Sequence, residues 1–271
     1  MFTKLLKHEF RATGRVVPFI YLVALFMILT NLLTRQLNIG GLSMLLQFLM
    51  VVVGLAAILM TYVVIVTRYY KNLYGNEAYL TQTMPVKSSR QVMSKAVVAF
   101  VWLILSYLVM GGIVLTIMIL TAKDQGQSIS KLLPGLIAGL GVQTSSFWLI
   151  VAAMAAYICL SMFYLLAQVY FAITLGNLSR FHSLGIAAPI LFYMGTNFLL
   201  QLCTLGAMIA IPLGLTIRQG VLTVVPQGML ATLLDPNIVI VGFGGIIFMI
   251  LATIGLFIGT VKLMQRHTSI K

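Results

Sequence analysis

The sequence predicts an all-α polytopic membrane protein with six transmembrane helices, forming a single transmembrane domain over residues 1–271. Of these residues 61% are hydrophobic and only 8% are charged, whereas charged residues make up about 25% of a typical soluble domain. Several apolar runs are each long enough to cross a hydrocarbon core of about 30 Å as a helix. The runs do not alternate polar with apolar residues, so a membrane β-barrel is not expected.

The N-terminal residues 1–15 predict an amphipathic helix that lies in the membrane interface. Apolar side chains such as Leu6 and Phe10 share one helical face, and basic side chains such as Lys4 and Arg11 lie largely on the other. This distribution is typical of a helix that lies in the plane of the membrane, where its basic residues meet anionic lipid.

Six spans follow, and their number places both termini on the same side of the membrane. No small-x-small cleavage pattern follows the first apolar run, so we expect a retained span and not a signal peptide. The spans are expected at residues 16–33, 42–67, 96–121, 147–173, 185–215 and 237–261.

The basic residues predict the orientation of these spans. Most of the 17 Lys and Arg residues fall in the two terminal segments, the 68–95 loop and the connection between spans four and five. By the positive-inside rule both termini are therefore expected in the cytoplasm. The exceptions, expected on the outer side, are Arg35, Lys123, Lys131 and Arg218.

Two outer segments, 129–140 and 216–236, are apolar but are not expected to span the membrane. The first carries a helical apolar stripe that is too short to cross, and Pro226 and Gly228 divide the second into two short pieces. We expect both to be re-entrant or interfacial helices. If the first were a true span, the basic C-terminal tail would lie outside.

The sequence lacks the residues that ion coupling, intramembrane hydrolysis or nucleotide binding would require. The predicted spans contain no interior Asp, Glu, Lys, Arg or His, which disfavours an ion-coupled carrier and an intramembrane hydrolase. No G-x-x-x-x-G-K-[ST] loop is present, so any ATP is expected on another subunit. The scattered basic residues form no nucleic-acid motif.

Cys159 and Cys203 lie in apolar runs and suggest neither a disulfide nor a metal site. We expect no catalytic residue and no cofactor in this chain.

Uncharged polar residues recur at helical spacing within the spans. Because an amide that faces lipid is costly, we expect these rows to face protein or a water-lined cavity. Hydrogen bonding between helices and a substrate path are both consistent with this pattern. The substrate-path candidates are Gln47, Tyr157, Gln168, Tyr193, Asn197 and Gln201.

The long polar loop at 68–95 contains a short helical stretch, a break at Pro85 and a helix restart at Ser88, whose spacing to Gln91 fits a capping box. Its five basic residues cannot be threaded through lipid, and we expect Arg90 and Lys95 to hold it against headgroups. Its apolar and aromatic side chains are typical of a surface that docks a soluble partner.

The run YKNLYGNEAYLTQTMPVKSSRQVMSKAV in this loop resembles the cytoplasmic loop between spans two and three of type-2 ABC exporter permeases, in particular the small bacterial drug and antimicrobial-peptide efflux type. In that family the loop carries a coupling helix that docks on the ATP-binding subunit. Glu77, Tyr79 and Leu80 are the expected central contacts. The residues that the resemblance assigns to docking are Gly75, Asn76, Glu77, Tyr79, Leu80, Met84 and Pro85.

The resemblance implies a permease subunit in the plasma membrane, most simply of a bacterium, that exports a hydrophobic or amphipathic substrate such as an antimicrobial peptide or drug. ATP and Mg would bind to two copies of a separate ATP-binding subunit. The other partners would be membrane lipid and a second permease chain, giving a homodimer or a pair with a sister chain. A non-transporting membrane sensor or scaffold that docks a cytoplasmic protein, and an ion-coupled carrier, are the alternatives.

Overall fold

A computed structural model of the chain describes residues 2–37, 40–75, 78, 86–126, 129–178, 181, 184–185, 187–218, 220–228 and 240–266. Within these ranges six helices are long and apolar enough to cross a membrane. Each of the six overlaps one of the predicted spans, which confirms a predominantly helical fold with six membrane-spanning candidates. The chain divides into two compact units, Met1–Leu132 and Leu133–Lys271.

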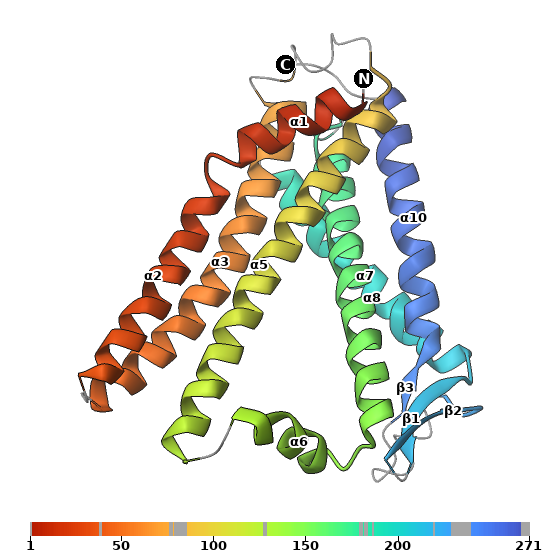
Figure 1. Cartoon of the computed structure of the whole chain (residues 1–271). Helices are drawn as coiled ribbons and strands as arrows, with labels where there is room; N and C mark the ends of the chain where they lie inside the picture. Colours follow the sequence, from red (N-terminus) through yellow and green to blue (C-terminus); the bar gives the residue numbers. More distant parts are fainter. Residues whose placement is uncertain are drawn as a thin grey trace. The chain divides into compact units, whose positions relative to one another are not determined.

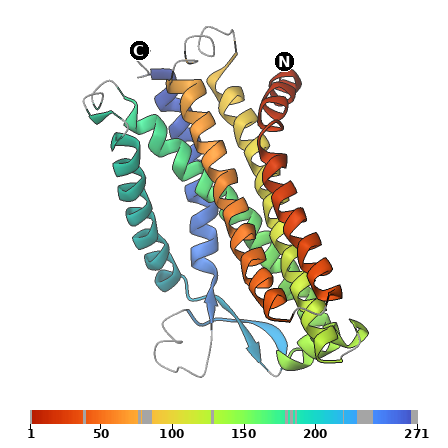
Figure 2. The ribbon, with the colours of Figure 1, turned by 90° about the vertical axis from the view of Figure 1, so that its left-hand side faces the viewer.

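The described part of unit 1 contains a short N-terminal helix followed by three long ones. These are α1 (Phe2–Thr13), α2 (Val17–Gln36), α3 (Gly40–Tyr74) and α5 (Ser88–Asp124). The three long helices pack on one another, and α1 packs on α5 at an angle to the others (Figures 1 and 2). We call the end of the unit that carries α1 the α1 end.

The core of unit 1 is apolar along most of its length. Ala24, Met50 and Ile113 bring one buried side chain each from α2, α3 and α5. Gly54 of α3 permits close approach there, since a Cβ atom on it would lie 2.5 Å from the Sδ atom of Met110. Most of the remaining large apolar side chains of α2 and α3 are exposed on the unit, as expected for helices in lipid.

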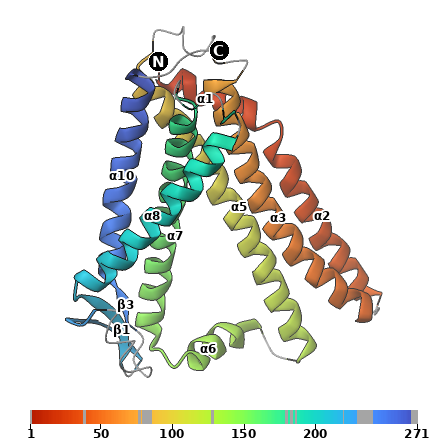
Figure 3. The same cartoon turned by 180° about the vertical axis from the view of Figure 1, so that it is seen from behind.

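Unit 2 contains α7 (Thr144–Gly176), α8 (Ala187–Ala210) and α10 (Phe243–Arg266), which all contact one another. Figure 3 shows α8 crossing the other two helices. Two glycines permit the crossings. A Cβ atom on Gly176 would lie 2.5 Å from the backbone nitrogen of Pro189, and one on Gly244 would lie 2.0 Å from the carbonyl oxygen of Ala207.

A small antiparallel sheet follows α8 and corrects the sequence prediction. Strands β1 (Gly214–Arg218), β2 (Val221–Val225) and β3 (Val241–Gly242) lie in the order β2-β1-β3. The expectation of re-entrant or interfacial helices in 216–236 is therefore wrong for residues 216–218 and 221–225, which lie in strands. Alternating Thr, Ile and Val residues favour strands here, and Gly220 has a positive φ of 77°, which suits a tight turn.

Other predicted bounds differ by a few residues for local reasons. The fifth predicted span extended to residue 215, but α8 ends at Ala210 because Pro212 cannot continue a helix. The predicted restart at Ser88 is confirmed as the first residue of α5, although Lys87 occupies the N-cap position and makes no side-chain capping bond. The segment 129–140 forms the helix α6 (Ile129–Gly139), and its expected place at the membrane surface stays a prediction.

We predict that Gly244→Ala destabilises unit 2, because the new methyl group would meet the backbone of Ala207. Overpacking of this kind costs about 1–3 kcal/mol or more, equivalent to a loss of roughly 3–10 °C in Tm. Thermal unfolding of the purified chain in detergent measures this change. Gly195→Ala on α8 is the matched control, because no atom lies within 4 Å of its new methyl group. Equal Tm values for the two variants would contradict the assigned crossing.

Candidate functional site

The residues assigned to docking lie between the end of α3 and the start of α5. Asn76, Glu77, Tyr79, Leu80, Met84 and Pro85 are outside the described residues. Gly75 follows α3 directly, and its amide donates to the carbonyl oxygens of Tyr70 and Lys71 at 3.0 and 3.2 Å. Ala78 is buried, and its amide donates to the Gly75 carbonyl at 2.9 Å. The structure thus describes the two flanks of the segment 76–85.

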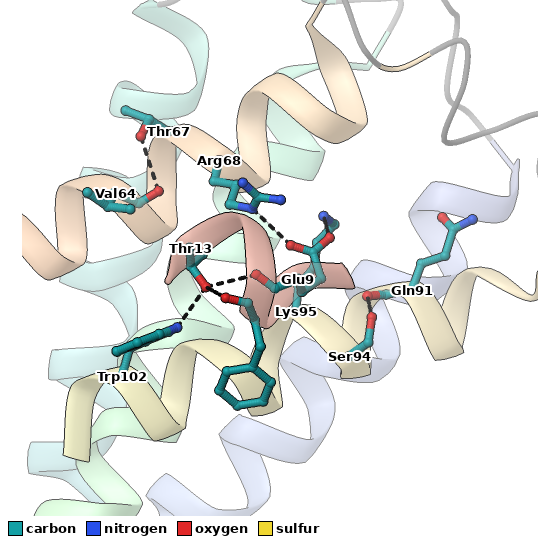
Figure 4. Close-up of polar contacts among 10 residues, drawn as sticks. Glu9, Thr13, Val64, Thr67, Arg68, Gln91, Ser94, Lys95 and Trp102 are labelled. Carbon is teal, nitrogen blue, oxygen red and sulfur yellow. Dashed lines mark hydrogen bonds and ion pairs between the residues drawn. The ribbon is translucent and has the colours of Figure 1, made fainter. Parts of the chain in front are cut away.

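Both flanks are attached to the same carboxylate on α1 (Figure 4). Arg68 Nε of α3 donates to Glu9 Oε2 at 2.9 Å, and Lys95 Nζ of α5 donates to Glu9 Oε1 at 2.5 Å. The side chains of Glu9 and Lys95 are only 14% and 7% exposed. We call these three residues the anchor cluster. Because each oxygen of one carboxylate binds a different helix, the cluster fixes the spacing of α1, α3 and α5.

The anchor cluster keeps Glu9 ionised. Burial raises the pKa of Glu9, but the charge of Lys95 and the hydrogen bonds from Lys95 and Arg68 outweigh burial and hold this pKa below its ordinary value. A buried ion pair of this kind is costly to break on one side only, because the remaining charge is left without compensation. We infer that α1 is held firmly on the bundle at neutral pH.

Lys95 does not have the role that the sequence suggested. It was expected to hold the loop against headgroups, but it is buried against Glu9, so that expectation is wrong for Lys95. Arg90 is exposed, and its contact with headgroups stays a prediction. The loop prediction failed for Lys95 because α5 begins at Ser88 and has already entered the bundle two turns later.

Uncharged hydrogen bonds continue the attachment along unit 1. Trp102 Nε1 of α5 donates to Thr13 Oγ1 of α1 at 2.7 Å. The hydroxyl of Tyr21, on α2, donates to the Trp102 carbonyl at 3.0 Å and lies 2.8 Å from Ser106 Oγ. Ser106 Oγ in turn donates to Thr61 Oγ1 of α3 at 2.8 Å. These polar contacts therefore connect α1, α2, α3 and α5 with one another.

A second polar group lies in unit 2, between α7 and α8. Asn197 Nδ2 donates to Gln168 Oε1 at 3.1 Å, and Gln201 Nε2 donates to Asn197 Oδ1 at 2.8 Å. The Tyr164 hydroxyl lies close enough to Gln168 and Thr204 to interact electrostatically with both. We call these five residues the amide cluster. It brings together three of the six substrate-path candidates, Gln168, Asn197 and Gln201.

The amide cluster runs from the interior of unit 2 to its surface. Gln168 is 2% exposed, whereas the side chain of Gln201 is exposed on α8. An exposed amide in a membrane-spanning helix needs a polar partner, because lipid tails offer none. The cluster can therefore offer both hydrogen-bond donors and acceptors, without charge, to a molecule or protein surface that contacts α8.

The other path candidates are not joined to this cluster by any contact described for them. Tyr157 is exposed about three turns before Gln168 on α7, and Tyr193 is half-buried on α8. Gln47 is half-buried in unit 1. Among the described residues no three His, Cys, Asp or Glu side chains lie close enough to hold a metal ion together. The two cysteines are free, and Cys203 is exposed.

Sequence reasoning missed the anchor cluster, although one signal pointed to it. Glu9 is the only acidic residue of the first 15 and falls on the same helical face as Leu6 and Phe10. A lone carboxylate on an apolar face calls for a buried cation. Its partners are 59 and 86 residues away in the sequence, so no local pattern could name them.

We predict that Glu9→Gln loosens α1, because Lys95 would be left buried with one charge partner removed. Removal of one partner of a buried pair costs on the order of 3 kcal/mol. Thermal unfolding at pH 7 measures the loss, and Lys7→Gln, which removes an exposed charge of the same helix, should change Tm by only about 1 °C. The assignment of the anchor cluster would be wrong if both variants unfolded at the wild-type temperature.

We also predict that the stability contributed by Glu9 depends on pH. Because the pKa of Glu9 is lower in the folded protein than its ordinary value of 4.5, the unfolded chain takes up the proton first as pH falls. The stability that Glu9 contributes is therefore complete well above pH 4.5 and is lost below it. Unfolding curves from pH 7 to pH 3 should show this loss for the wild type and a smaller loss for Glu9→Gln. Identical pH profiles would contradict it.

We predict that Asn197→Ala weakens the contact between α7 and α8, because Gln168 would keep its buried amide without this donor. Hydrogen bonds between helices in membranes contribute about 0.5–1.5 kcal/mol, so Tm should fall by a few degrees. Met194→Ala removes an exposed side chain one turn away and serves as the control. A larger loss for Met194→Ala would show that lipid packing, and not the amide cluster, stabilises this helix.

No protein-family model, no curated protein and no solved structure matches this chain. The functional proposal is therefore based on the anchor cluster, the amide cluster and the sequence of the 68–95 segment.

Proposed function

We propose that this chain is the membrane-spanning permease subunit of an ATP-driven exporter of the type-2 ABC kind, with a hydrophobic or amphipathic substrate such as an antimicrobial peptide or drug. The observation that carries the proposal is the anchor cluster. It attaches both flanks of the segment that resembles a coupling helix to one carboxylate on α1.

A segment through which an ATPase moves a membrane protein must be held at both ends. Arg68 lies two turns before the end of α3, and Lys95 lies two turns after the start of α5. A force applied to residues 76–85 would therefore act on α3, α5 and α1 together. Without the anchor cluster the same force could separate α3 from α5 and would be lost within unit 1.

The amide cluster supports the choice of substrate. Its five side chains carry amides and hydroxyls but no ionised group. Such groups match the amides and hydroxyls of a peptide or a polar drug, whereas a strongly charged metabolite would leave its charge uncompensated. We propose that Gln201, which is exposed on α8, makes the first contact with the substrate.

The remaining parts of the proposal follow from the resemblance. ATP and Mg bind to two copies of a separate ATP-binding subunit, and a second permease chain, identical or a sister chain, completes the pathway. The α1 end of unit 1 faces the cytoplasm of a bacterial cell. This chain performs no hydrolysis itself.

Reconstitution tests the proposal. The chain is purified with the ATPase that binds it, placed in liposomes, and assayed for ATP hydrolysis with and without a panel of amphipathic peptides and hydrophobic drugs. Substrate should stimulate hydrolysis. In Glu77→Ala with Tyr79→Ala the stimulation should fall about tenfold or more, because truncation of central interface residues costs 2 kcal/mol or more.

Thr81→Ala with Thr83→Ala is the matched control, since these residues lie in the same segment but outside the docking motif. It should retain stimulation. Binding of a cytoplasmic protein that hydrolyses no ATP would favour the sensor or scaffold, and transport that follows an ion gradient without an ATPase would favour the carrier. Either result would refute the exporter.

A further inference from the structure

The helix α1 uses its two faces differently. Leu6 and Phe10 pack against the buried side chains of Val17, Val98 and Trp102, and Glu9 and Thr13 are hydrogen-bonded on the same side. The apolar face is thus occupied by protein. It is not available to insert into lipid, which is the usual way for an amphipathic helix to bind a membrane.

The opposite face of α1 is basic and exposed. At 100° per residue, Lys4, Lys7 and Arg11 fall within an arc of roughly 60°, about opposite Leu6 and Thr13. All three side chains are exposed, as is that of Arg15, which follows the helix. We call these four residues the basic face. It has the opposite orientation from the face that holds α1 on the bundle.

No described carboxylate neutralises this face. The chain has only four Asp and Glu residues. Glu9 is already paired with two cations, and Asp124 is paired with Arg35 at the other end of unit 1. Glu77 and Asp235 lie outside the described residues. The same end of the unit also carries the exposed side chains of Lys71, Lys87 and Arg90.

The connection to α2 fixes the depth of the basic face. With 20 residues, α2 is about 30 Å long, which matches the hydrocarbon thickness of a bilayer. Only residues 14–16 separate it from α1, and three residues reach at most about 10 Å. A span formed by α2 therefore places α1 in the headgroup layer, where the nearest anions are lipid phosphates.

We propose that the basic face of α1 binds the headgroups of anionic phospholipids. Attraction of this kind acts over about a Debye length, accumulates with each basic residue near the surface, and weakens with salt. An acidic protein surface would offer similar charge, but the short connection to α2 favours lipid. This inference requires no ATPase and does not depend on the proposed export function.

The test uses the full chain in nanodiscs made of phosphatidylcholine and phosphatidylglycerol in a 7:3 ratio. Native mass spectrometry of the released protein gives the ratio of the two lipids that stay bound. The wild type should retain phosphatidylglycerol well above its bulk share. One variant combines four neutral substitutions, Lys4→Gln, Lys7→Gln, Arg11→Gln and Arg15→Gln, and its enrichment should fall on the order of tenfold. The control variant combines four charge-conserving substitutions, Lys4→Arg, Lys7→Arg, Arg11→Lys and Arg15→Lys, and should keep the wild-type enrichment.

Salt provides a second measurement that needs no variant. Enrichment on the wild type should decrease from 0.05 M to 1 M NaCl, because the Debye length falls from roughly 14 Å to about 3 Å. The proposal is overturned if the wild type retains the bulk lipid ratio or if the Gln variant keeps the wild-type enrichment. It is also overturned if the Gln variant loses a bound acidic protein while its bound lipids stay unchanged, because the basic face would then bind protein and not lipid.

Discussion

A single carboxylate, largely shielded from solvent, organises the α1 end of unit 1. Glu9 would be unfavourable where it lies without cations, and Arg68 and Lys95 provide them from two different helices. The same contacts fix α1 against the bundle, hold α3 and α5 at a set spacing, and direct the basic face outward. The network from Thr13 through Trp102, Tyr21 and Ser106 to Thr61 repeats this attachment with uncharged bonds. The proposed docking of an ATPase and the proposed binding of anionic lipid at this end both depend on the contacts of Glu9.

The two units use different polar chemistry within similar apolar surroundings. Unit 1 concentrates charge at its α1 end, where water and headgroups can compensate it. Unit 2 places amides and hydroxyls between α7 and α8, with Gln168 buried and Gln201 exposed. Uncharged groups are tolerated at membrane depth far better than ionised ones. The separation fits a protein that is driven at one place and contacts its substrate at another.

Hydrophobicity and helical spacing were sufficient to predict the spans and the rows of uncharged polar residues within them. Gln168 on one helix and Asn197 and Gln201 on the next were predicted from their spacing, and hydrogen bonds join these three residues in the structure. Helix ends were less predictable, because α3 and α5 extend beyond the length that lipid requires. The hairpin β1–β2 was missed because periodicity alone does not distinguish a helix from a strand in such short apolar pieces, and the β-branched residues that favour a strand were not weighed. The anchor cluster depends on contacts between distant segments, which a single sequence does not encode locally.

The central claim is that the α1 end, with the segment 76–85, lies on the side of the membrane where an ATPase can reach it. Lys87 is exposed at the start of α5, so Lys87→Cys, with Cys159→Ser and Cys203→Ser, provides a single reporter thiol. A membrane-impermeant maleimide should label this thiol in inside-out membrane vesicles and leave it unlabelled in intact cells. Labelling in intact cells, at the rate of a cysteine placed at Lys123, would put the segment beyond the reach of any cytoplasmic ATPase and would contradict the account.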